Sequence, residues 1–457
     1  MSKIVPRIPA GFMELSPADQ LVMSKMQKII AEVFESFGFV PIDTPVMELS
    51  EVLLAKAGGE TEKQIYSFKK GDTDLALRFD LTVPLARYVV MHQNDLVFPF
   101  KRYHIGKVYR GERPQKGRFR EFYQCDIDVV GRGDLDVSYD AEMPAVIFHV
   151  FKELGLKDFQ IHINNRKVLN GLCEYLTLTS EQTLDVLHVI DKIAKIGKDQ
   201  VINELETLHI PSNKIDEIIN FISIKGSSEE LIQKLNAFPA QNPLYRLGVK
   251  ELESVVHGMK LLSIPEDNYT IDLSITRGLD YYTGTVYETM IKNHPDIGSI
   301  CSGGRYDNLS SFYTNEKMPG VGISIGLTRL FDQLKNRNML QQSSIKTTTS
   351  VLIAPFADKS DYALKLAAAL RKEKVNVELF MNNSKFNKKM QYANKIGVPL
   401  VAVIGEDEEK AGAVTIKEME TGNQVTLPLQ KAIVHIKKHQ DNMRQNAPKI
   451  IKSLERD

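Results

Sequence analysis

The sequence predicts an α+β protein in which helices flank an antiparallel sheet, with a helical insertion and a C-terminal α/β domain. Three observations lead to this prediction. Residues 100–130 contain two strand-like stretches joined by a loop with glycine and proline, which indicates an antiparallel pair. Residues 166–258 consist of successive helical segments with short polar joins. Beyond residue 350, strand-like and helical segments alternate, which favours a sheet with mainly parallel strands.

Size and charge limit the kinds of protein that this chain can be. Its 457 residues allow two to four domains, at roughly 150 residues each. Hydrophobic residues (43%) and charged residues (25%) are in the range of ordinary soluble globular proteins, so we expect a packed core. The 58 basic and 58 acidic residues leave no net charge. A nucleic-acid partner would therefore be held by local basic patches rather than by the field of the whole protein.

Cysteine spacing and the N-terminus argue against several other classes. Cys125, Cys173 and Cys301 lie far apart with no C-x-x-C pair, so they indicate neither a disulfide framework nor a zinc site. The N-terminus lacks the apolar core of a signal peptide, and no apolar run approaches the length of a membrane span. We therefore expect a cytoplasmic protein without a membrane partner.

The first predicted element is a helix that starts near Ser16. Ser16 suits the N-cap, Pro17 suits the first turn, and Asp19 suits the positive end of the helix dipole. Gly38 is a good C-terminal stop. Between these ends one face is apolar, which is usual for a face that packs on a core. That face comprises Val22, Met26, Ile29, Ile30, Val33 and Phe37.

A hairpin and a second helix are predicted next. Residues 65–68 and 75–79 are strand-like and flank a Lys-Gly-Asp turn. A helix with Pro84 in its first turn can then begin, with Asp80 or Thr82 as its cap.

The stretch at residues 119–130 alternates with the period of a strand, so its two faces differ. Odd positions are mostly apolar: Phe119, Tyr123, Cys125, Ile127 and Val129. Even positions carry cations, an amide, carboxylates and one ring: Arg118, Arg120, Phe122, Gln124, Asp126 and Asp128. Residues 102–110 form the partner strand, and Gly111, Pro114 and Gly117 mark the loop between the two.

The polar face of this pair has two interpretations. Simple solvation is one, because antiparallel sheets often face water on one side. A binding site is the other: Arg110, Arg118 and Phe122 together suit a polyphosphate attached to a flat base. Guanidinium forks pair with phosphate oxygens, and an aromatic ring offers a stacking face.

Glycine patterns after Tyr269, where strand-rich sequence resumes, do not identify a nucleotide site. Gly320, Gly322 and Gly326 are spaced G-x-G-x-x-x-G, one residue too long for the dinucleotide fingerprint. No G-x-x-x-x-G-K-[ST] occurs, so any use of ATP proceeds without a P-loop. The pair Gly303-Gly304 is compatible with a tight turn.

The C-terminal part begins with a polar stretch at residues 331–349 that is typical of a linker. In the α/β domain beyond it, the second predicted helix gathers four lysines, and such a charge run is most often a solvated face. These lysines are Lys385, Lys388, Lys389 and Lys395. The tail after His439 is charged and is predicted to form a loosely held helix.

Five stretches resemble the class II aminoacyl-tRNA synthetases, in the form that the histidyl-tRNA synthetase family has. RGERPQKGRFREF with QCDIDVVG is similar to the second motif of the class, GFVPIDTPVME to the first, and GVGISIGLTR to the third. TRGLDYYTGTVYE and SICSGGRYD resemble two signatures of the histidyl family itself. The resemblance implies these parts: a class II catalytic domain at 1–165 and 259–335, a helical insertion at 166–258, a linker at 336–349, an anticodon-binding α/β domain at 350–438 and a charged tail at 439–457.

The activity that the resemblance implies has two steps. Histidine and ATP give histidyl-adenylate and pyrophosphate, and the histidyl group then passes to the 3′ end of the histidine tRNA. ATP would enter with Mg²⁺ as a substrate, and neither a tightly bound prosthetic group nor a metal held by the protein is expected. The first motif lies at the dimer interface in this family, so a homodimer through the N-terminal helix and strand is implied. The C-terminal domain would bind the anticodon stem, where some of the four lysines would meet phosphate.

The ATP site that the resemblance implies contains five residues with separate roles. These are Arg110 on the α-phosphate, Glu112 on the adenine amino group, Phe122 stacked on the base, and Arg118 and Arg329 on the outer phosphates. Arg277 would lie on the opposite side of the α-phosphate from Arg110, where related synthetases place a metal ion. Arg110 and Arg277 are therefore the implied catalytic residues.

The implied histidine site has one part for the ring and one for the ammonium group. Imidazole offers a donor and an acceptor, and Asp128 and Tyr282 would pair with them. Asp80, Thr82 and Gln124 would hold the ammonium group. The full implied set is Asp80, Leu81, Thr82, Arg110, Gln124, Asp128, Arg277, Tyr281 and Tyr282.

Two details of this set are specific to the chain. Many members of the family carry glutamate at the positions of Asp80 and Asp128, and the aspartates keep the charge but shorten the reach. Gln124 and Asp128 share the strand parity of Phe122, so the alternation places all three on one face independently of the resemblance. Gln115, in the loop, is implied to contact the acceptor end of the tRNA.

Two other classes of protein compete with this interpretation. One is a catalytically silent synthetase-like regulatory protein, but such relatives typically lose the C-terminal domain or the signature arginines and tyrosines, which are present here. The other is a plain RNA-binding protein whose sheet face reads bases, which leaves the third motif and the histidyl signatures unexplained.

Overall fold

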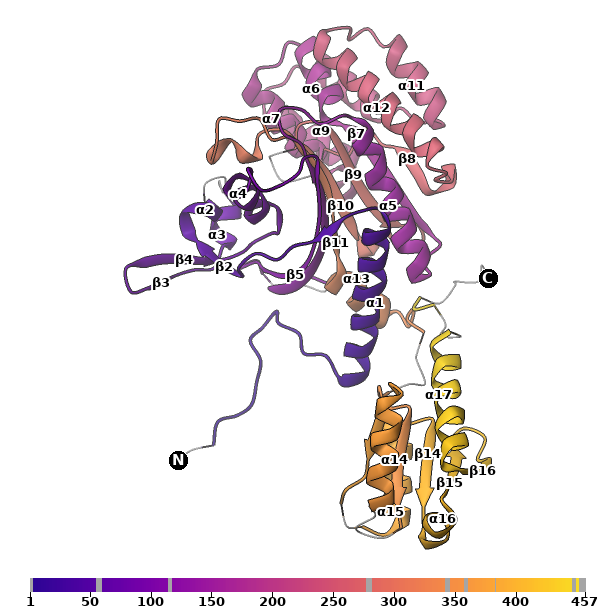
Figure 1. Cartoon of the computed structure of the whole chain (residues 1–457). Helices are drawn as coiled ribbons and strands as arrows, with labels where there is room; N and C mark the ends of the chain where they lie inside the picture. Colours follow the sequence, from indigo (N-terminus) through magenta and orange to yellow (C-terminus); the bar gives the residue numbers. More distant parts are fainter. Residues whose placement is uncertain are drawn as a thin grey trace. The chain divides into compact units, whose positions relative to one another are not determined.

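The structure is a computed structural model that describes residues 3–54, 60–113, 117–276, 282–341, 346–356, 361–382, 384–445 and 449–451. The chain divides into two compact units, one made mainly of Gln27–Met339 and the other mainly of Leu340–Lys452. Each unit has a sheet of its own (Figure 1). None of the described helices is long and apolar enough to span a membrane.

Helix α1 (Pro17–Ser36) confirms the first predicted helix. The Ser16 hydroxyl oxygen accepts a hydrogen bond from the Asp19 backbone N–H at 3.2 Å, which satisfies a donor that every helix start leaves open. After the helix, Gly38 has a φ of +79°, a conformation that glycine adopts without steric cost. Met26, Ile30 and Val33 of the predicted apolar face are buried.

The larger unit is built on an eight-stranded sheet. Its six central strands run antiparallel to one another, and each edge strand is parallel to the strand beside it. In spatial order the strands are β1 (Val40–Pro41), β5 (Phe100–Tyr109), β6 (Glu121–Val130), β11 (Gly320–Gly326), β10 (Cys301–Tyr306), β9 (Thr285–Ile291), β7 (Phe159–Asn165) and β8 (Tyr269–Ile271). The antiparallel pair predicted at residues 100–130 is β5 with β6, and Arg102 stands opposite Asp128 in their register.

Both faces of the main sheet are buried around the second half of β6. Helix α5 (Ser138–Leu154) packs over the apolar face, where the Tyr287 hydroxyl on β9 donates to the Asp140 carbonyl oxygen. Helix α4 (Thr82–Met91) packs over the polar face, where Ala86 contacts Tyr306 of β10. Gln124, Asp126 and Asp128 are therefore buried, and the interpretation of this face as simply solvated is wrong for them.

Smaller elements complete this unit around the site. The predicted hairpin is β3 (Ser67–Lys70) with β4 (Thr73–Leu77), and β2 (Met47–Leu49) joins β4 on its other side. The remaining elements outside the insertion are α2 (Ser50–Leu54), α3 (Glu60–Gln64), α13 (Leu327–Asn336) and the short 3₁₀ turns Glu266–Asn268, Pro295–Ile297 and Leu309–Phe312.

The predicted insertion is helical and packs tightly on the sheet domain (Figure 1). Its helices are α6 (Arg166–Tyr175), α7 (Ser180–Ile190), α8 (Ile193–Ile196), α9 (Lys198–Thr207), α10 (Ser212–Ile222), α11 (Ser228–Ala237) and α12 (Pro243–Leu261). Glycines let α6 and α12 approach closely, since a Cβ on Gly171 would lie 2.5 Å from the Tyr245 backbone nitrogen. The predicted boundary at residue 258 falls inside α12, and the limits of the domains stay a prediction.

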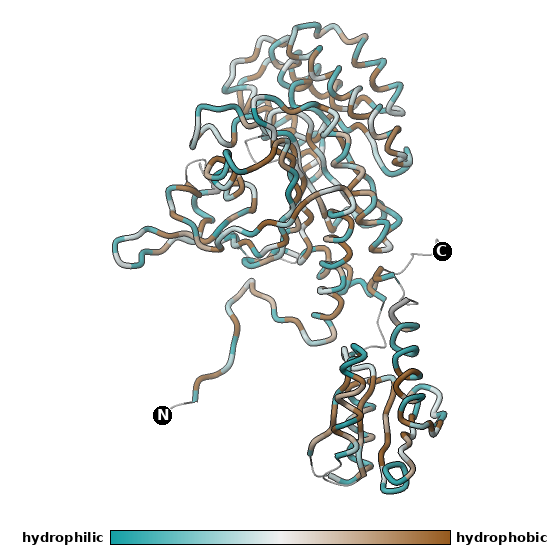
Figure 2. Tube along the Cα trace, in the orientation of Figure 1, coloured by the Kyte–Doolittle hydropathy of each residue, from teal (hydrophilic) through white to brown (hydrophobic). Residues whose placement is uncertain are grey.

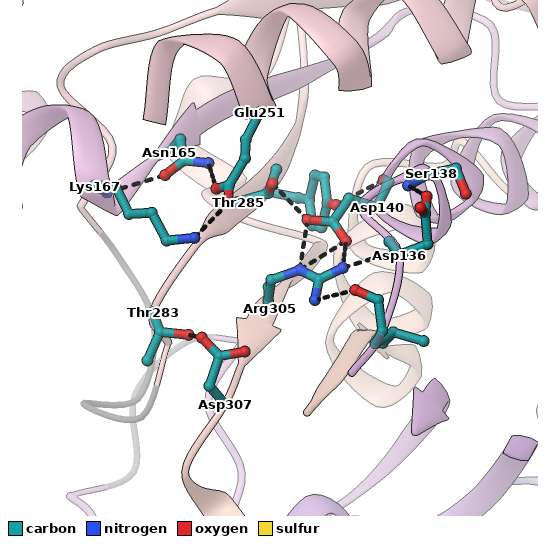
Figure 3. Close-up of polar contacts among 12 residues, drawn as sticks. Asp136, Ser138, Asp140, Asn165, Lys167, Glu251, Thr283, Thr285, Arg305 and Asp307 are labelled. Carbon is teal, nitrogen blue, oxygen red and sulfur yellow. Dashed lines mark hydrogen bonds and ion pairs between the residues drawn. The ribbon is translucent and has the colours of Figure 1, made fainter. Parts of the chain in front are cut away.

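A buried ion pair joins β10 to α5 at the apolar face, as Figure 3 shows. Arg305 donates to Asp140 through Nη2 at 2.6 Å and Nε at 3.0 Å, and the Thr285 hydroxyl donates to the same carboxylate at 2.6 Å. Burial raises the pKa of Asp140, and Arg305 opposes that rise. Beside it, Asn165 and Lys167 both donate to Glu251 of α12, which ties the start of α6 to that helix.

Replacing Arg305 with methionine is expected to lower the free energy of unfolding by about 3–5 kcal/mol, because the buried Asp140 carboxylate loses its counter-charge. Chemical denaturation followed by circular dichroism measures the change. Arg132→Met is the matched control, because Arg132 also pairs with a carboxylate, that of Glu316 at 2.8 Å, but on the surface. Its expected loss is about 0–1 kcal/mol. Equal losses in the two variants would contradict the structural role of the buried pair.

The smaller unit is an α/β domain with a mixed five-stranded sheet. Its strands, in spatial order, are β13 (Val377–Leu379), β12 (Val351–Pro355), β14 (Leu400–Ile404), β15 (Ala413–Glu418) and β16 (Gln424–Pro428). The first three are parallel, as predicted, and the last two are antiparallel additions. Figure 2 shows the brown of hydrophobic residues along β12 and β14, which are buried throughout.

Helices flank this sheet, and the last of them ends beyond the predicted domain boundary at residue 438. They are α14 (Asp361–Lys372), α15 (Phe386–Ile396), α16 (Glu406–Ala411) and α17 (Leu429–Gln445). Gln440 on α17 is buried, and its side-chain oxygen accepts from the Ser350 hydroxyl at 2.6 Å. The start of the predicted tail is thus a packed part of this unit.

Candidate active site

The polar face of the main sheet brings together residues from four strands. Across the sheet, Arg102 on β5, Asp128 on β6, Gly322 on β11 and Gly304 on β10 stand opposite one another. Opposite residues of neighbouring strands share a face, so these side chains point to the same side of the sheet. The parity that the sequence predicted for Phe122, Gln124 and Asp128 is thereby confirmed.

Glycines on β10 and β11 make room over this face. A Cβ on Gly322 would lie 2.2 Å from the Asp128 carboxylate, and a Cβ on Gly320 would lie 2.5 Å from the Tyr306 ring. Gly304 lies within the extended strand β10, where a Cβ would come 2.9 Å from the Tyr282 ring. The tight-turn interpretation of Gly303-Gly304 is therefore wrong, because the pair serves close approach in a strand.

Asp128 is fixed by two donors at the centre of this face. Its Oδ2 lies 2.5 Å from Arg102 Nη2, and its Oδ1 accepts from the Tyr306 hydroxyl at 2.8 Å. Burial raises the pKa of Asp128 to about 6, while Arg102 and Tyr306 oppose that rise. The carboxylate is thus held in one orientation, and its pKa lies close to neutral pH.

The segment before α4 lies close to the same guanidinium. Asp80 accepts from the backbone N–H groups of Thr82 and Val83 at 3.2 and 2.9 Å, so of the two predicted candidates it is the one that bonds the start of α4, although Leu81 occupies the N-cap position. Burial raises the pKa of Asp80, against the charges of Arg110 and Arg102. The Leu81 carbonyl oxygen accepts from Arg102 Nη2 at 3.2 Å, and the Leu81 side chain is buried.

Gln124 lies between this polar cluster and a neighbouring cavity. Its amide nitrogen donates to the Ser324 hydroxyl at 2.6 Å. Its amide oxygen is buried and has no hydrogen-bond partner among the described residues. Because an unpaired buried acceptor is costly, this oxygen is suited to a donor that a ligand brings.

The cavity has a volume of about 320 Å³ and is lined by all five residues that the resemblance implies for ATP: Arg110, Glu112, Arg118, Phe122 and Arg329. Gln124 and Ser324 also line it, which connects it to the polar face. Asp128 lies further along the same face of β6, since it is four residues from Gln124, or about 13 Å at strand spacing.

Aromatic rings hold Arg110 in the cavity. Its guanidinium carbon lies 4.4 Å from the Phe79 ring centroid and 5.1 Å from that of Phe122, and its Nε donates to the Phe79 carbonyl oxygen at 3.3 Å. A cation between two rings is oriented and partly desolvated, which strengthens its attraction for an anion.

The other charged lining residues have protein partners in this structure. Arg118 donates to Glu112 at 3.1 Å on the exposed side of the cavity. Arg329, in the first turn of α13, donates to the Ile297 carbonyl oxygen. Both guanidinium groups border the same cavity, so a polyphosphate that enters it would meet several positive charges.

Three of the predicted site residues lie outside the described residues: Arg277, Tyr281 and Gln115. The implied convergence of Arg277 and Arg110 on one phosphorus atom therefore stays a prediction. Tyr282 is described, and it packs with Val83, Ala86 and Tyr306 beside the polar face.

Sequence reasoning missed Arg102 and Tyr306, the two partners of Asp128. Tyr306 belongs to the stretch SICSGGRYD, so the family signature contained it without a stated role. Arg102 is a charged residue inside a predicted strand. Its position opposite Asp128 in the register places it on the polar face of the sheet. A charge inside a predicted strand was the signal that the sequence offered, and the structure shows this arginine to be fully buried, which is rare unless the charge is paired.

A mainly antiparallel sheet with an arginine-lined cavity, a buried carboxylate further along the same face and a separate α/β domain defines the chain as a class II aminoacyl-tRNA synthetase. Comparison with known proteins narrows this class to one family. The family model "Histidyl-tRNA synthetase" matches residues 11–330, and the model "Anticodon binding domain" matches residues 350–439. The chain belongs to the histidyl-tRNA synthetase family.

Individual relatives agree with this assignment. The chain is 56% identical to a histidine–tRNA ligase of Clostridium tetani (strain Massachusetts / E88), over 95% of the chain and 98% of the relative. The crystal structure of histidyl-tRNA synthetase from Nostoc sp. PCC 7120 superposes with a TM-score of 0.85 at 40% identity, covering 95% of this chain and all of the other.

A third relative shows what the fold alone can establish. A Bacillus halodurans structure described as an ATP phosphoribosyltransferase regulatory subunit/histidyl-tRNA synthetase has a TM-score of 0.71 at 18% identity, over 88% of this chain and 99% of that one. At that identity the likeness concerns the fold only. The silent regulatory alternative has no support beyond the shared fold, whereas the active family is supported by high identity over the whole length.

Proposed function

We infer that this chain is a histidine–tRNA ligase. It activates histidine with ATP to histidyl-adenylate and pyrophosphate, and it transfers the histidyl group to the 3′ end of its tRNA. The observation that carries the site assignment is that the buried Asp128, held by two donors, shares one sheet face with Gln124, which lines a cavity that also contains three arginines. ATP enters as its magnesium salt, and we place the reaction in the cytoplasm.

Activation needs no covalent intermediate with the enzyme. A carboxylate oxygen of histidine attacks the α-phosphorus of ATP, a new P–O bond forms, and the bond to pyrophosphate breaks. Catalysis then depends on positioning and on stabilising negative charge at the phosphoryl oxygens. Arg110 contacts the α-phosphate, Arg118 and Arg329 contact the outer phosphates, and Phe122 stacks on adenine, all from residues that line the cavity.

Glu112 and Arg118 rearrange in this proposal. Glu112 accepts from the adenine amino group, and Arg118 moves from Glu112 to the outer phosphates. Both side chains are at the open side of the cavity, so their exchange of partners requires little repacking. Arg277 completes the set opposite Arg110.

Histidine binds between the segment before α4 and β6. Asp128, in its ionised form, accepts from an N–H of the imidazole ring, and Tyr282 lies at the other side of the ring. Asp80, Thr82 and the unpaired oxygen of Gln124 receive the ammonium group. A buried polar pocket of this kind rejects side chains that leave its groups unpaired.

Histidine-dependent exchange of labelled pyrophosphate into ATP tests the activation step. The purified chain is expected to support exchange with histidine and not with the other amino acids, and to charge histidine tRNA. Exchange that does not depend on histidine, or none at all, would overturn the proposal, since the regulatory and RNA-binding alternatives do not carry out this reaction.

A homodimer is part of the proposal. Strands β1 and β2 expose large apolar side chains, with Val40 at 49%, Met47 at 52% and Leu49 at 45%. Exposed apolar residues at one edge are usual where a second copy packs. Sedimentation is expected to give twice the chain mass of 51.6 kDa, and Met47→Asp is expected to shift the protein toward monomer. A monomeric wild-type protein at micromolar concentration would contradict this.

The tRNA contacts proposed for the smaller unit concern three of the four lysines on α15 and at its N-cap. Lys385, Lys388 and Lys395 are exposed, whereas Lys389 is buried and donates to the Pro355 carbonyl oxygen at 2.6 Å. Lys389 is thus a packing residue and is excluded from the phosphate contacts.

Lys388→Ala is expected to weaken tRNA binding and to reduce the salt dependence of the affinity by about one unit of slope, the effect of losing one phosphate contact. Filter binding at several salt concentrations measures it. Lys372→Ala, on α14 of the same unit, is the control for removing a surface charge from another helix. An unchanged slope for Lys388→Ala would remove this lysine from the contacts.

A further inference from the structure

We propose that Arg102 is a positioning residue for the amino-acid substrate. It links the segment of residues 80–82, which receives the ammonium group, to the Asp128 carboxylate, which accepts from the imidazole ring. The proposal rests on the histidine site described above and adds to it a residue that contacts no substrate. It assigns Arg102 two tasks, holding two parts of the pocket at a fixed spacing and keeping Asp128 in its acceptor form.

The first task follows from the geometry of a single nitrogen. Arg102 Nη2 lies 3.2 Å from the Leu81 carbonyl oxygen and 2.5 Å from Asp128 Oδ2. Leu81 follows Asp80 directly, and Asp128 lies on the next strand of the sheet, opposite Arg102 in register. The distance between the two ends of the histidine site is therefore set through one guanidinium group.

Stability alone does not account for this arginine. Arg102 has no exposed surface, and its Nε and Nη1 are buried without hydrogen-bond partners among the described residues. An unpaired buried donor destabilises the folded state, because it loses its hydrogen bonds to water. Replacing a buried ion pair by apolar side chains is often neutral or stabilising. A charge retained under these conditions points to a role in the site.

The second task follows from the charges around Arg102. Three buried carboxylates face it: Asp80 before α4, and Asp126 and Asp128 on β6. Arg102 lowers the pKa of each one against the effect of burial, which still raises the pKa of Asp126 to about 7 and that of Asp128 to about 6. Without this cation the pKa of Asp128 rises further, and the carboxyl group becomes protonated near neutral pH.

The other titratable groups that face Arg102 do not replace its charge. Burial, Arg102 and Arg78 lower the pKa of His104 on β5 to about 3, so its ring is neutral. Burial raises the pKa of Tyr306 on β10 well above its usual range, so its hydroxyl stays a donor to Asp128. Arg110 lowers the pKa of Asp80, whereas the cation that lowers the pKa of Asp128 is Arg102.

The charge state of Asp128 decides how it pairs with imidazole. An ionised carboxylate accepts from a ring N–H, whereas a protonated one carries a donor of its own. Keeping Asp128 ionised therefore selects the ring orientation that points an N–H toward β6. Relative to the wild type, loss of Arg102 should weaken histidine binding most between about pH 6, where wild-type Asp128 ionises, and the higher pKa of the variant, and least above that pKa.

Pyrophosphate exchange with three variants of the full-length protein tests this. Arg102→Met is expected to raise the KM for histidine about tenfold at neutral pH with little change in the KM for ATP, the effect of one charged hydrogen bond. That elevated KM is expected to fall again toward about pH 9, as Asp128 ionises. Arg102→Lys keeps the charge and is expected to restore the wild-type pH profile, with an intermediate KM because an ammonium group spans both partners poorly.

Lys101→Met is the matched control. Lys101 is the neighbouring cation on β5, it points to the opposite face, and it pairs with Glu142 of α5 at 2.7 Å. Its loss is expected to leave both KM values unchanged. If Arg102→Met fails to fold, Tyr306→Phe carries the pH test, because it removes the other donor to Asp128 and should shift the histidine KM in the same direction.

The outcomes separate this proposal from the function on which it rests. Wild-type protein without histidine-dependent exchange would overturn the function itself. If Asp128→Asn raises the histidine KM and Arg102→Met does not, only the role of Arg102 is wrong. A loss in Arg102→Met that is equal for histidine and ATP and constant with pH would show a general structural effect, and would also overturn the proposal.

Discussion

Replacing Arg110 with methionine is expected to slow histidine-dependent pyrophosphate exchange about a hundredfold at saturating substrates. Loss of one charged donor to the reacting phosphoryl group removes about 3 kcal/mol of stabilisation from the transition state. The effect should be large here because Arg110 is already oriented between the Phe79 and Phe122 rings, so little reorganisation accompanies the reaction.

The control for Arg110 is Lys107→Met on the same hairpin. Lys107 lies on the other face of β5 and pairs with Glu121 at 2.7 Å, so its loss removes a charge nearby without touching the cavity. Exchange rates measured at several ATP concentrations separate binding from catalysis. A raised KM for ATP with an unchanged kcat would mean that Arg110 binds the ground state and the transition state equally, against the catalytic role proposed for it.

Replacing Asp128 with alanine is expected to lower kcat/KM for histidine about a hundredfold and to affect ATP use far less. The carboxylate supplies a charged hydrogen bond to the ring, and its removal leaves Arg102 without its partner in a buried site. Asp128→Asn should act in the same direction, because an amide keeps the shape but loses the charge. Varying each substrate at a saturating level of the other gives the comparison.

Glu121→Gln serves as the control for Asp128. Glu121 begins the same strand, but it lies at the opposite face and pairs with Lys107. Its kinetic constants should match those of the wild type. Equal losses of histidine use and ATP use in Asp128→Ala would contradict the assignment of this carboxylate to the imidazole ring.

Local patterns in the sequence were sufficient for the strands that carry the site. Side chains alternate with a period of two along any strand, so the even spacing of Phe122, Gln124 and Asp128 is enough to predict that they share a face. The same local logic predicted α1, because the cap at Ser16 and the stop at Gly38 act within one turn of each helix end.

Lysines and glycines show where local patterns are insufficient. The four lysines on α15 and at its N-cap look equivalent in the sequence, yet Lys389 is buried and donates to a carbonyl oxygen. Gly303 and Gly304 look like a turn, yet they lie in a strand where a Cβ would collide with neighbouring strands and with Tyr282. In both cases the outcome depends on chain segments that lie far away in the sequence.

The amino-acid sequence by itself determined the family, the order of the elements and the face on which the candidate residues lie, because motifs, caps and alternation are properties of short stretches. Only the tertiary structure decided that α4 covers the polar face, that Asp128 is buried, and that Arg102 and Tyr306 hold it. The physical reason is that burial and charge pairing depend on which distant segments meet, and Leu81, Arg102, Asp128 and Tyr306 come together only when the sheet has formed.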